Sequence, residues 1–158
     1  MRPTADRVRE ALFSILGDVA DTRVLDLFAG TGALAIEALS RGAAEATLVD
    51  TDTAPAARNL AALGLEDRAR VVRTDARAFV RRERASFDLV FCDPPYRLAD
   101  RLGPDLDNSL PRLLSPEGLV IVESAAREPL EVALPLRDER RYGDTLVRIH
   151  AAPGAAGS

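Results

Sequence analysis

One tetrapeptide has residue types suited to chemistry on an amino group: Asp93-Pro94-Pro95-Tyr96, which directly follows an apolar run. Two prolines hold φ near about −65° and restrict the residues before them, so this loop is stiff. An exocyclic amino group of a nucleobase is a poor nucleophile, because its lone pair is delocalised into the ring. The Asp93 carboxylate and the Pro94 carbonyl can accept its two N–H bonds and orient the lone pair for methyl transfer. Tyr96 can stack on the base, so we predict these four residues as the catalytic site for an extruded or single-stranded base.

A glycine turn earlier in the chain predicts a cofactor site. The run Val24-Leu25-Asp26-Leu27-Phe28 is followed by Gly30 and Gly32, where a strand can turn tightly into a helix and let a ligand approach the backbone. Asp50 ends the next apolar run and is placed to hydrogen-bond a ribose diol. We predict Asp26, Phe28, Gly30, Gly32 and Asp50 as cofactor-binding residues.

The charge of Asp26 bears on which cofactor binds. A carboxylate just before the turn disfavours the negative pyrophosphate of a nicotinamide dinucleotide, and it favours the sulfonium and ammonium of S-adenosylmethionine. Asp75 ends the third run and Ala76 follows it, so the carboxylate of Asp75 and the backbone N–H of Ala76 can bind an adenine ring. Asp75 is also a candidate helix N-cap and can serve both roles. We predict that Asp75, Ala76 and Asp93 complete the site for S-adenosylmethionine.

Composition limits the other chemistries. The 158 residues include one Cys and one His, too few for a disulfide framework or a zinc cluster, so we expect no metal. Cys92 could be the nucleophile of a cytosine-C5 enzyme, but we interpret it as strand packing; His150 is expected to be structural or exposed. No apolar run is long enough to cross a bilayer. We expect a monomeric cytoplasmic protein without membrane contacts.

The charges are distributed unevenly. The net charge is −4, which argues against a polyanionic partner, yet all 21 basic residues are Arg and they cluster at residues 2–9, 68–84 and 137–141. Arg binds phosphate and stacks on bases, so local patches could bind nucleic acid. The alternative is that these are solvated faces paired with nearby acidic residues.

The pattern of runs predicts how these residues are positioned. Apolar runs alternate with helical stretches, which is typical of a parallel sheet with helices on both faces. We expect one domain over residues 1–150 and a disordered tail over residues 151–158. A first helix is expected from an N-cap at Thr4 to Gly17, and further helices at 33–41, 54–63, 76–84 and 106–114. Strands are expected at 23–28, 46–49, 69–73, 87–91 and 119–123. A turn is expected at 116–118, and a final hairpin pairs 139–142 with 145–150.

Together these residues resemble the class I S-adenosylmethionine-dependent methyltransferases, and more narrowly the RsmD-type bacterial 16S rRNA guanine-N2 methyltransferases. The resemblance spans nearly the whole chain. It rests on six segments: Arg2-Pro-Thr-Ala-Asp-Arg-Val-Arg-Glu-Ala-Leu-Phe13, Leu25-Asp-Leu-Phe-Ala-Gly-Thr-Gly-Ala33, Glu37-Ala-Leu-Ser-Arg-Gly-Ala43, Asp93-Pro-Pro-Tyr96, Val122-Glu123 and Tyr142-Gly-Asp-Thr145.

The resemblance implies a Rossmann-like α/β fold with a mostly parallel seven-stranded sheet in the order 3-2-1-4-5-7-6 and an antiparallel hairpin at the C-terminal end. It also implies S-adenosylmethionine as the methyl donor and, as acceptor, a guanine of small-subunit rRNA in an assembly intermediate. Asp50 stands where the family often has Glu. Family members carry a basic hairpin ahead of the Arg-Pro-Thr motif, and the resemblance leads us to expect that it is missing here.

Two further functions remain open at this stage. The Asp-Pro-Pro-Tyr loop also suits adenine-N6 enzymes, so methylation of DNA at adenine N6 or another base is one alternative. The other is a catalytically weak module that binds S-adenosylmethionine without engaging RNA, if the basic hairpin is missing.

Overall fold

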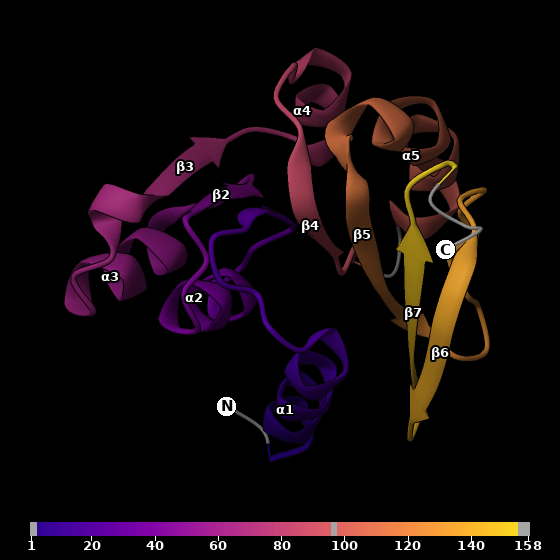
Figure 1. Ribbon diagram of the computed structural model, residues 1–158, viewed down its shortest axis with the longest axis horizontal. Coiled ribbons are helices and arrows are strands. Elements are labelled where there is room, and N and C mark those ends of the chain that lie inside the picture. The colour runs from indigo at the N-terminus through magenta and orange to yellow at the C-terminus, as the bar shows by residue number, and fades with distance from the viewer. Residues whose placement is uncertain (1–2, 96–97, 155–158) are drawn as a thin grey trace.

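Seven strands form one sheet in the order β3-β2-β1-β4-β5-β7-β6 (Figure 1). The computed structural model describes residues 3–95 and 98–154. The order confirms the one that the resemblance implied. The strands are β1 (Arg23–Leu27), β2 (Glu45–Asp50), β3 (Ala69–Arg73), β4 (Phe87–Cys92), β5 (Leu114–Ala125), β6 (Leu136–Tyr142) and β7 (Thr145–Ala151).

The first five strands in space pair in parallel, and β7 pairs antiparallel with both β5 and β6. The predicted hairpin is confirmed, because Tyr142 pairs with Thr145 across Gly143, whose φ is 60°. In the part of the chain that the structure describes, no helix is long and apolar enough to span a bilayer. The helices are α1 (Pro3–Leu16), α2 (Ala33–Ser40), α3 (Ala54–Ala62), α4 (Ala76–Arg82) and α5 (Ala99–Leu113), with a short 3-10 turn η1 (Glu66–Arg68).

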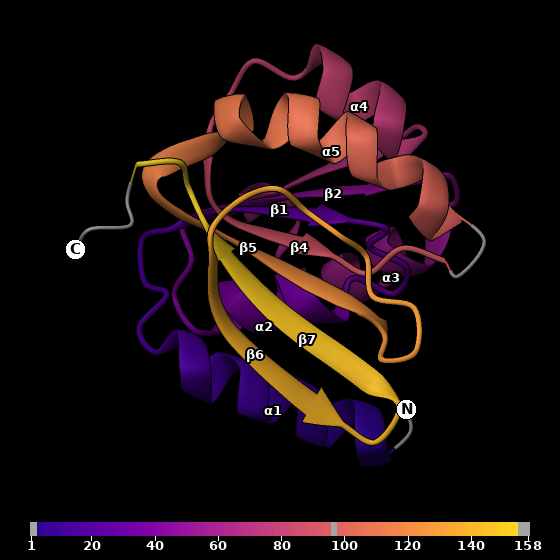
Figure 2. The same ribbon diagram turned by 90° about the vertical axis from the view of Figure 1, so that its right-hand side faces the viewer.

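The sheet lies between two helical layers (Figure 2). Side chains alternate across a strand, and in β4 Leu89 and Phe91 face one layer while Val90 and Cys92 face the other. The layer under Phe91 contains α1, α2 and α3, and the opposite layer contains α4 and α5. Burial on both faces explains why the strands read as continuous apolar runs rather than as alternating ones.

Helix α5 is longer than the sequence indicated. It begins at Ala99 although Pro104 lies inside it, whereas a start near residue 106 was predicted. Leu102, Leu106 and Leu110 lie one turn apart and are almost fully buried against the sheet. Burial of this apolar face outweighs the backbone hydrogen bond that a proline removes.

Other expected boundaries differ as well, and β6 begins at Leu136 rather than at residue 139. Helix α1 begins at Pro3, so Thr4 lies within it and is not the N-cap, in keeping with the preference of proline for a first helical turn. The turn expected at 116–118 is an irregularity inside β5, where pairing shifts from Phe87 with Leu114 to Leu89 with Leu119.

At the chain's end, β7 extends to Ala151. Ala152 is buried and its N–H donates to the carbonyl of Gly118. The first two residues of the expected tail therefore belong to the fold, while residues 155–158 lie outside the described part of the chain.

The buried face of α5 predicts that truncating a buried leucine lowers the free energy of unfolding much more than truncating an exposed one. Leu106 is fully buried and Leu63 is 59% exposed at the end of α3. We expect Leu106→Ala to lower the free energy of unfolding by about 2–5 kcal/mol, since it leaves a cavity, and Leu63→Ala to change it by less than about 0.5 kcal/mol. Urea unfolding followed by circular dichroism measures both, and equal losses in the two variants would contradict this packing.

Candidate active site

The glycine loop and the Asp-Pro-Pro loop leave the sheet side by side. In the parallel pairing of β1 with β4, the last residues of the two strands, Leu27 and Cys92, are directly opposite each other. The chain continues from Leu27 into the glycine loop and from Cys92 into Asp93. The carboxyl ends of parallel strands are where ligands bind in open α/β sheets.

Positive φ angles shape the glycine loop. Phe28, Gly30 and Gly32 have φ of 60°, 57° and 82°, in the region that glycine tolerates best. A Cβ on Gly30 would meet nothing within 4 Å, whereas one on Gly32 would lie 3.0 Å from Cδ2 of Leu48. Gly30 therefore presents open backbone to a ligand. The absence of a Cβ at Gly32 lets α2 pack closely on the sheet, and its contact with a ligand stays a prediction.

Asp50 braces the glycine loop. Its Oδ2 accepts the N–H of Gly30 at 2.8 Å, and its Oδ1 accepts the N–H of Thr51 at 2.7 Å and that of Asp52 at 3.3 Å. The bond from Gly30 joins the end of β2 to the turn after β1, and the other two orient the carboxylate of Asp50 within its own loop. The sequence placed Asp50 at this edge but did not predict that it would hold the loop itself.

Asp26 lies buried beneath the loop. It is 3% exposed, and its Oδ2 accepts the N–H of Ala35 at 3.2 Å. Burial raises the pKa of Asp26 to about 7; the hydrogen bond from Ala35 opposes this, and the negative charges of Asp93, Glu123 and Asp50 add to it. A cation bound at this edge would lower the cost of keeping these carboxylates ionised.

Asp75 caps helix α4. Its Oδ1 accepts the N–H of Arg77 at 2.7 Å and that of Ala78 at 3.4 Å, so the N-cap role considered for this residue is confirmed. Partial burial raises the pKa of Asp75, but the hydrogen bonds from Arg77 and Ala78 outweigh it and leave the pKa below its usual value. Ala76 is the first residue of α4 and is buried.

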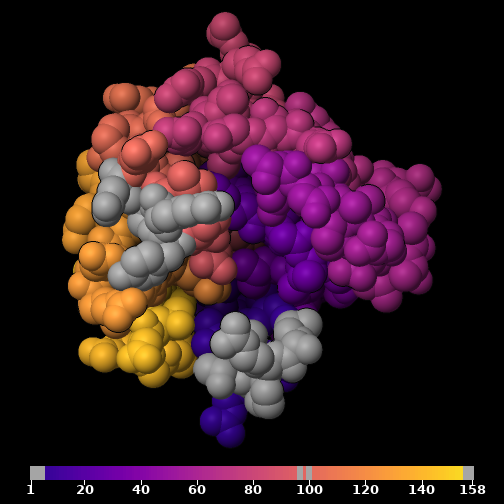
Figure 3. Space-filling view, turned by 180° about the vertical axis from the view of Figure 1, so that it is seen from behind, coloured from indigo at the N-terminus to yellow at the C-terminus, as the bar shows by residue number. Residues whose placement is uncertain are grey.

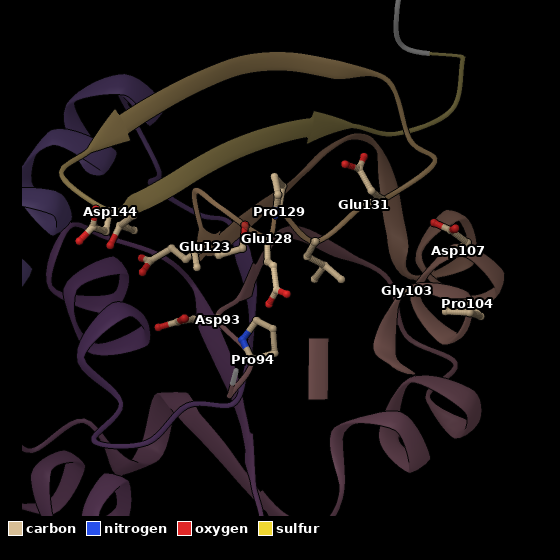
Figure 4. A pocket seen from close by; sticks show the side chains of 14 residues that line it. Asp93, Pro94, Gly103, Pro104, Asp107, Glu123, Glu128, Pro129, Glu131 and Asp144 are labelled. Atoms are coloured by element: carbon tan, nitrogen blue, oxygen red, sulfur yellow. The ribbon is translucent and has the colours of Figure 1, made fainter. Parts of the chain in front are cut away.

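Asp93 and Pro94 line a cavity of about 750 Å³. The cavity lies between α5, the ends of β4 and β5, the loop after β5 and the β6–β7 turn (Figure 4). Pro95 is exposed beside it, and Tyr96 lies outside the described residues. Figure 3 shows the molecule from behind the view of Figure 1. A hollow there lies between the surface formed by the first half of the chain and the surface formed by the second half.

The cavity is acidic. Among the described residues that line it none is basic, and six are carboxylic acids: Asp93, Asp107, Glu123, Glu128, Glu131 and Asp144. Desolvation raises the pKa values of both Asp93 and Glu123, and the charge of Asp93 raises that of Glu123 further. Asp93 lines the cavity and still reaches solvent. The protein around it removes part of the water from its carboxylate, and this partial desolvation raises its pKa.

Glu123 was not predicted as a site residue. It follows Leu119 and Ile121 at a period of two in β5, so the strand pattern alone would make it apolar. A charged residue at the carboxyl end of a buried parallel strand was the available signal.

Two reactive side chains are excluded from the chemistry. Cys92 is buried, and burial together with the charges of Asp93 and Asp26 raises the pKa of its thiol, so it is not a thiolate nucleophile. His150 is buried as well, with Nδ1 3.0 Å from the carbonyl of Leu134. Both observations agree with the packing and structural roles expected for these residues.

Several arginines of the expected clusters form ion pairs. Arg70 lies 2.6 Å from Glu83, Arg81 lies 3.0 Å from Asp105, and Arg140 lies 3.0 Å from Asp138. These three guanidinium groups match the alternative considered from the sequence, in which the clusters are surface faces paired with acidic residues.

The residues present fit a cationic adenosine cofactor. Gly30 offers open backbone beyond β1. Asp50, Asp93 and Glu123 come from the carboxyl ends of β2, β4 and β5, and they lie close enough to Asp26 for their charges to raise its pKa. That field favours a ligand with positive charge over a pyrophosphate.

Comparison with known proteins identifies the family. The family model described as "Conserved hypothetical protein 95" matches residues 1–151. The chain is 43% identical over 137 residues to "Ribosomal RNA small subunit methyltransferase D" of Escherichia coli K12, a match that covers 82% of this chain and 67% of that protein.

Solved structures show the same fold. A conserved hypothetical protein of Streptococcus pyogenes matches with a TM-score of 0.83 and 34% identity, over 93% of this chain and 96% of that one. An RNA methyltransferase of Salinibacter ruber, solved with S-adenosyl-L-homocysteine, shares the fold at a TM-score of 0.73 and 19% identity, over 97% and 95% of the two chains. The family model, the 43% identity and the two loops at the ends of β1 and β4 show that this chain belongs to the RsmD family of methyltransferases.

Proposed function

We propose that the protein transfers a methyl group from S-adenosylmethionine to the exocyclic N2 amino group of a guanine in small-subunit rRNA. The observation that supports this best is the pairing of Leu27 with Cys92, which brings the glycine loop and Asp93 to the same edge of the sheet. Membership of the RsmD family supports the choice of rRNA. We also propose that the protein acts as a monomer in the cytoplasm. Its rRNA substrate would be part of an assembly intermediate of the small subunit.

In this mechanism the protein orients the acceptor nitrogen. S-adenosylmethionine, when bound, supplies an electrophilic methyl group on a sulfonium. The Asp93 carboxylate and the Pro94 carbonyl accept the two N–H bonds of the amino group, which turns its lone pair toward the cofactor side of the site. Asp93 also favours the positive charge that develops on the nitrogen and can hold the proton that it loses. Tyr96 is proposed to stack on the base, and Pro95 to keep the loop stiff.

The cofactor is proposed to lie over the glycine loop. Gly30 would let it approach the backbone, and Asp26 would favour its positive charge from below. Asp50 uses some of its carboxylate lone pairs to brace the loop. The remaining lone pairs are proposed to accept hydrogen bonds from a ribose diol. Phe28, Gly32, Asp75 and Ala76 are proposed to complete its surroundings, with the second oxygen of Asp75 left for an adenine amino group.

The first test measures transfer itself. Small subunits from a strain lacking its own RsmD-type enzyme are incubated with tritiated S-adenosylmethionine and the protein, and the modified nucleoside is identified by mass spectrometry. We expect N2-methylguanosine. Duplex DNA is assayed in parallel under the same conditions. N6-methyldeoxyadenosine in the DNA, with no transfer to the subunits, would favour the DNA alternative, and cofactor binding without transfer to either substrate would favour the binding module.

In the same assay, Asp93→Ala tests the catalytic loop. We expect a loss of about 10²- to 10³-fold in the rate of transfer, as for removal of one transition-state hydrogen-bonding group. Asp67→Ala removes an exposed carboxylate in η1, beside the opposite ends of the strands, and is expected to leave the rate unchanged. An unaltered rate in Asp93→Ala would overturn the role assigned to this residue.

Two glycine variants separate strain from ligand binding. Gly30 and Gly64 both have positive φ, 57° and 69°, and a Cβ at either would meet nothing within 4 Å. We expect Gly30→Ala and Gly64→Ala to lower the free energy of unfolding by a similar amount, about 1–2 kcal/mol. Only Gly30→Ala should weaken binding of S-adenosylhomocysteine in calorimetry, and equal affinity in both variants would argue against cofactor contact at Gly30.

The pH dependence of transfer tests the raised pKa values. The mechanism needs Asp93 as a carboxylate, and desolvation raises its pKa, so activity should be full above the raised pKa and lost as the pH falls through it. We expect the acidic limb of the single-turnover rate to lie clearly above the ordinary Asp range near pH 4. Circular dichroism at each pH confirms folding. A limb at pH 4 or below would contradict the desolvated carboxylate.

A further inference from the structure

We propose that Glu123 selects the acceptor base by accepting the N1–H of guanine while Asp93 accepts from the neighbouring amino group. This inference rests on the proposed function and assigns a specificity-determining residue within its site.

The sheet places the two carboxylates as a pair. Cys92 of β4 and Val122 of β5 are directly opposite in the parallel register. The next residues are Asp93, which directly follows β4, and Glu123, which lies in the neighbouring strand β5. Adjacent strands are about 4.7–4.9 Å apart. In Figure 4 the two carboxylate groups extend toward the same side of the cavity. Two acceptors this close can bind two donors on adjacent atoms of one ring.

Guanine offers those donors and adenine does not. The Watson–Crick edge of guanine has an N1–H beside its N2 amino group, whereas N1 of adenine is an unprotonated acceptor. A carboxylate facing N1 would therefore bind guanine and repel the lone pair of adenine. A site built to bind an N–H rejects an analogue that lacks it strongly, because the buried acceptor is left without a partner.

The electrostatics of the cavity favour a ligand that donates. Asp93 and Glu123 disfavour each other's charge, and desolvation raises the pKa values of both. No basic side chain lies among the described residues that line the cavity. Hydrogen bonds from the ligand are thus a direct way to stabilise both carboxylates in their ionised forms.

The other acidic residues of the cavity are less suited to this role. Asp107 accepts the N–H of Ala133 at 2.8 Å, and Glu131 lies 3.5 Å from Arg148. Glu128 in the loop after β5 and Asp144 in the β6–β7 turn are both exposed. Glu123 is half-buried within β5 and its strand pairs on both sides, so the sheet fixes its position relative to Asp93.

A base analogue isolates the N1 contact. Small subunits are reconstituted with rRNA carrying, at the position that the transfer assay identifies, either guanine or 2-aminopurine. The analogue keeps the amino group to be methylated but presents N1 as an acceptor. Single-turnover rates on both substrates are measured for the wild-type protein, Glu123→Gln and the control Glu128→Gln, and calorimetry with S-adenosylhomocysteine tests each variant for an intact fold and cofactor site.

We expect the wild-type protein to prefer guanine by at least about 100-fold. Because the glutamine amide can donate to N1, Glu123→Gln should reduce that ratio at least about 10-fold, with cofactor affinity retained, while Glu128→Gln keeps it. An unchanged ratio in Glu123→Gln, or equal losses on both bases together with weaker cofactor binding, would overturn the inference. Absence of transfer by the wild-type protein to guanine would instead overturn the proposed function, and the inference with it.

Discussion

The parallel pairing of β1 with β4 is the contact on which the rest of the site depends. It sets Leu27 opposite Cys92, so the glycine loop and the Asp-Pro-Pro loop leave the sheet at one level. A shift of one residue would turn the side chains of a strand to the other face. Burial of Phe91 and of Val90 on opposite faces holds this register, so the two helical layers indirectly set the distance between the two halves of the site.

The same edge concentrates carboxylates that are wholly or partly desolvated. Asp26 is buried beneath the glycine loop, Asp93 directly follows β4, and Glu123 lies in β5. Keeping these groups ionised costs free energy in the protein alone, as their raised pKa values indicate. The cost is reduced by ligands that bring positive charge or hydrogen-bond donors, which are the properties of the proposed cofactor and of the proposed base.

Much of the fold could be predicted because its signals are local. Buried parallel strands are apolar runs, and Gly30 and the proline pair mark the points where two of them end. The prediction failed at α5 and at the start of β5. Pro104 and the Pro116–Gly118 turn look like breaks in a sequence, and only contacts with the sheet keep α5 and β5 continuous through them.

The groups available for the site can be identified in the sequence: a flexible glycine turn, a stiff Asp-Pro-Pro loop and carboxylates at the ends of the strands. How these groups are used depends on the folded arrangement. It made Asp50 a brace for Gly30 and Gly32 a packing position, and it set Glu123 beside Asp93. The physical reason is that strand register, burial and like-charge proximity join residues far apart in the chain, and no local pattern records which neighbour each residue will have.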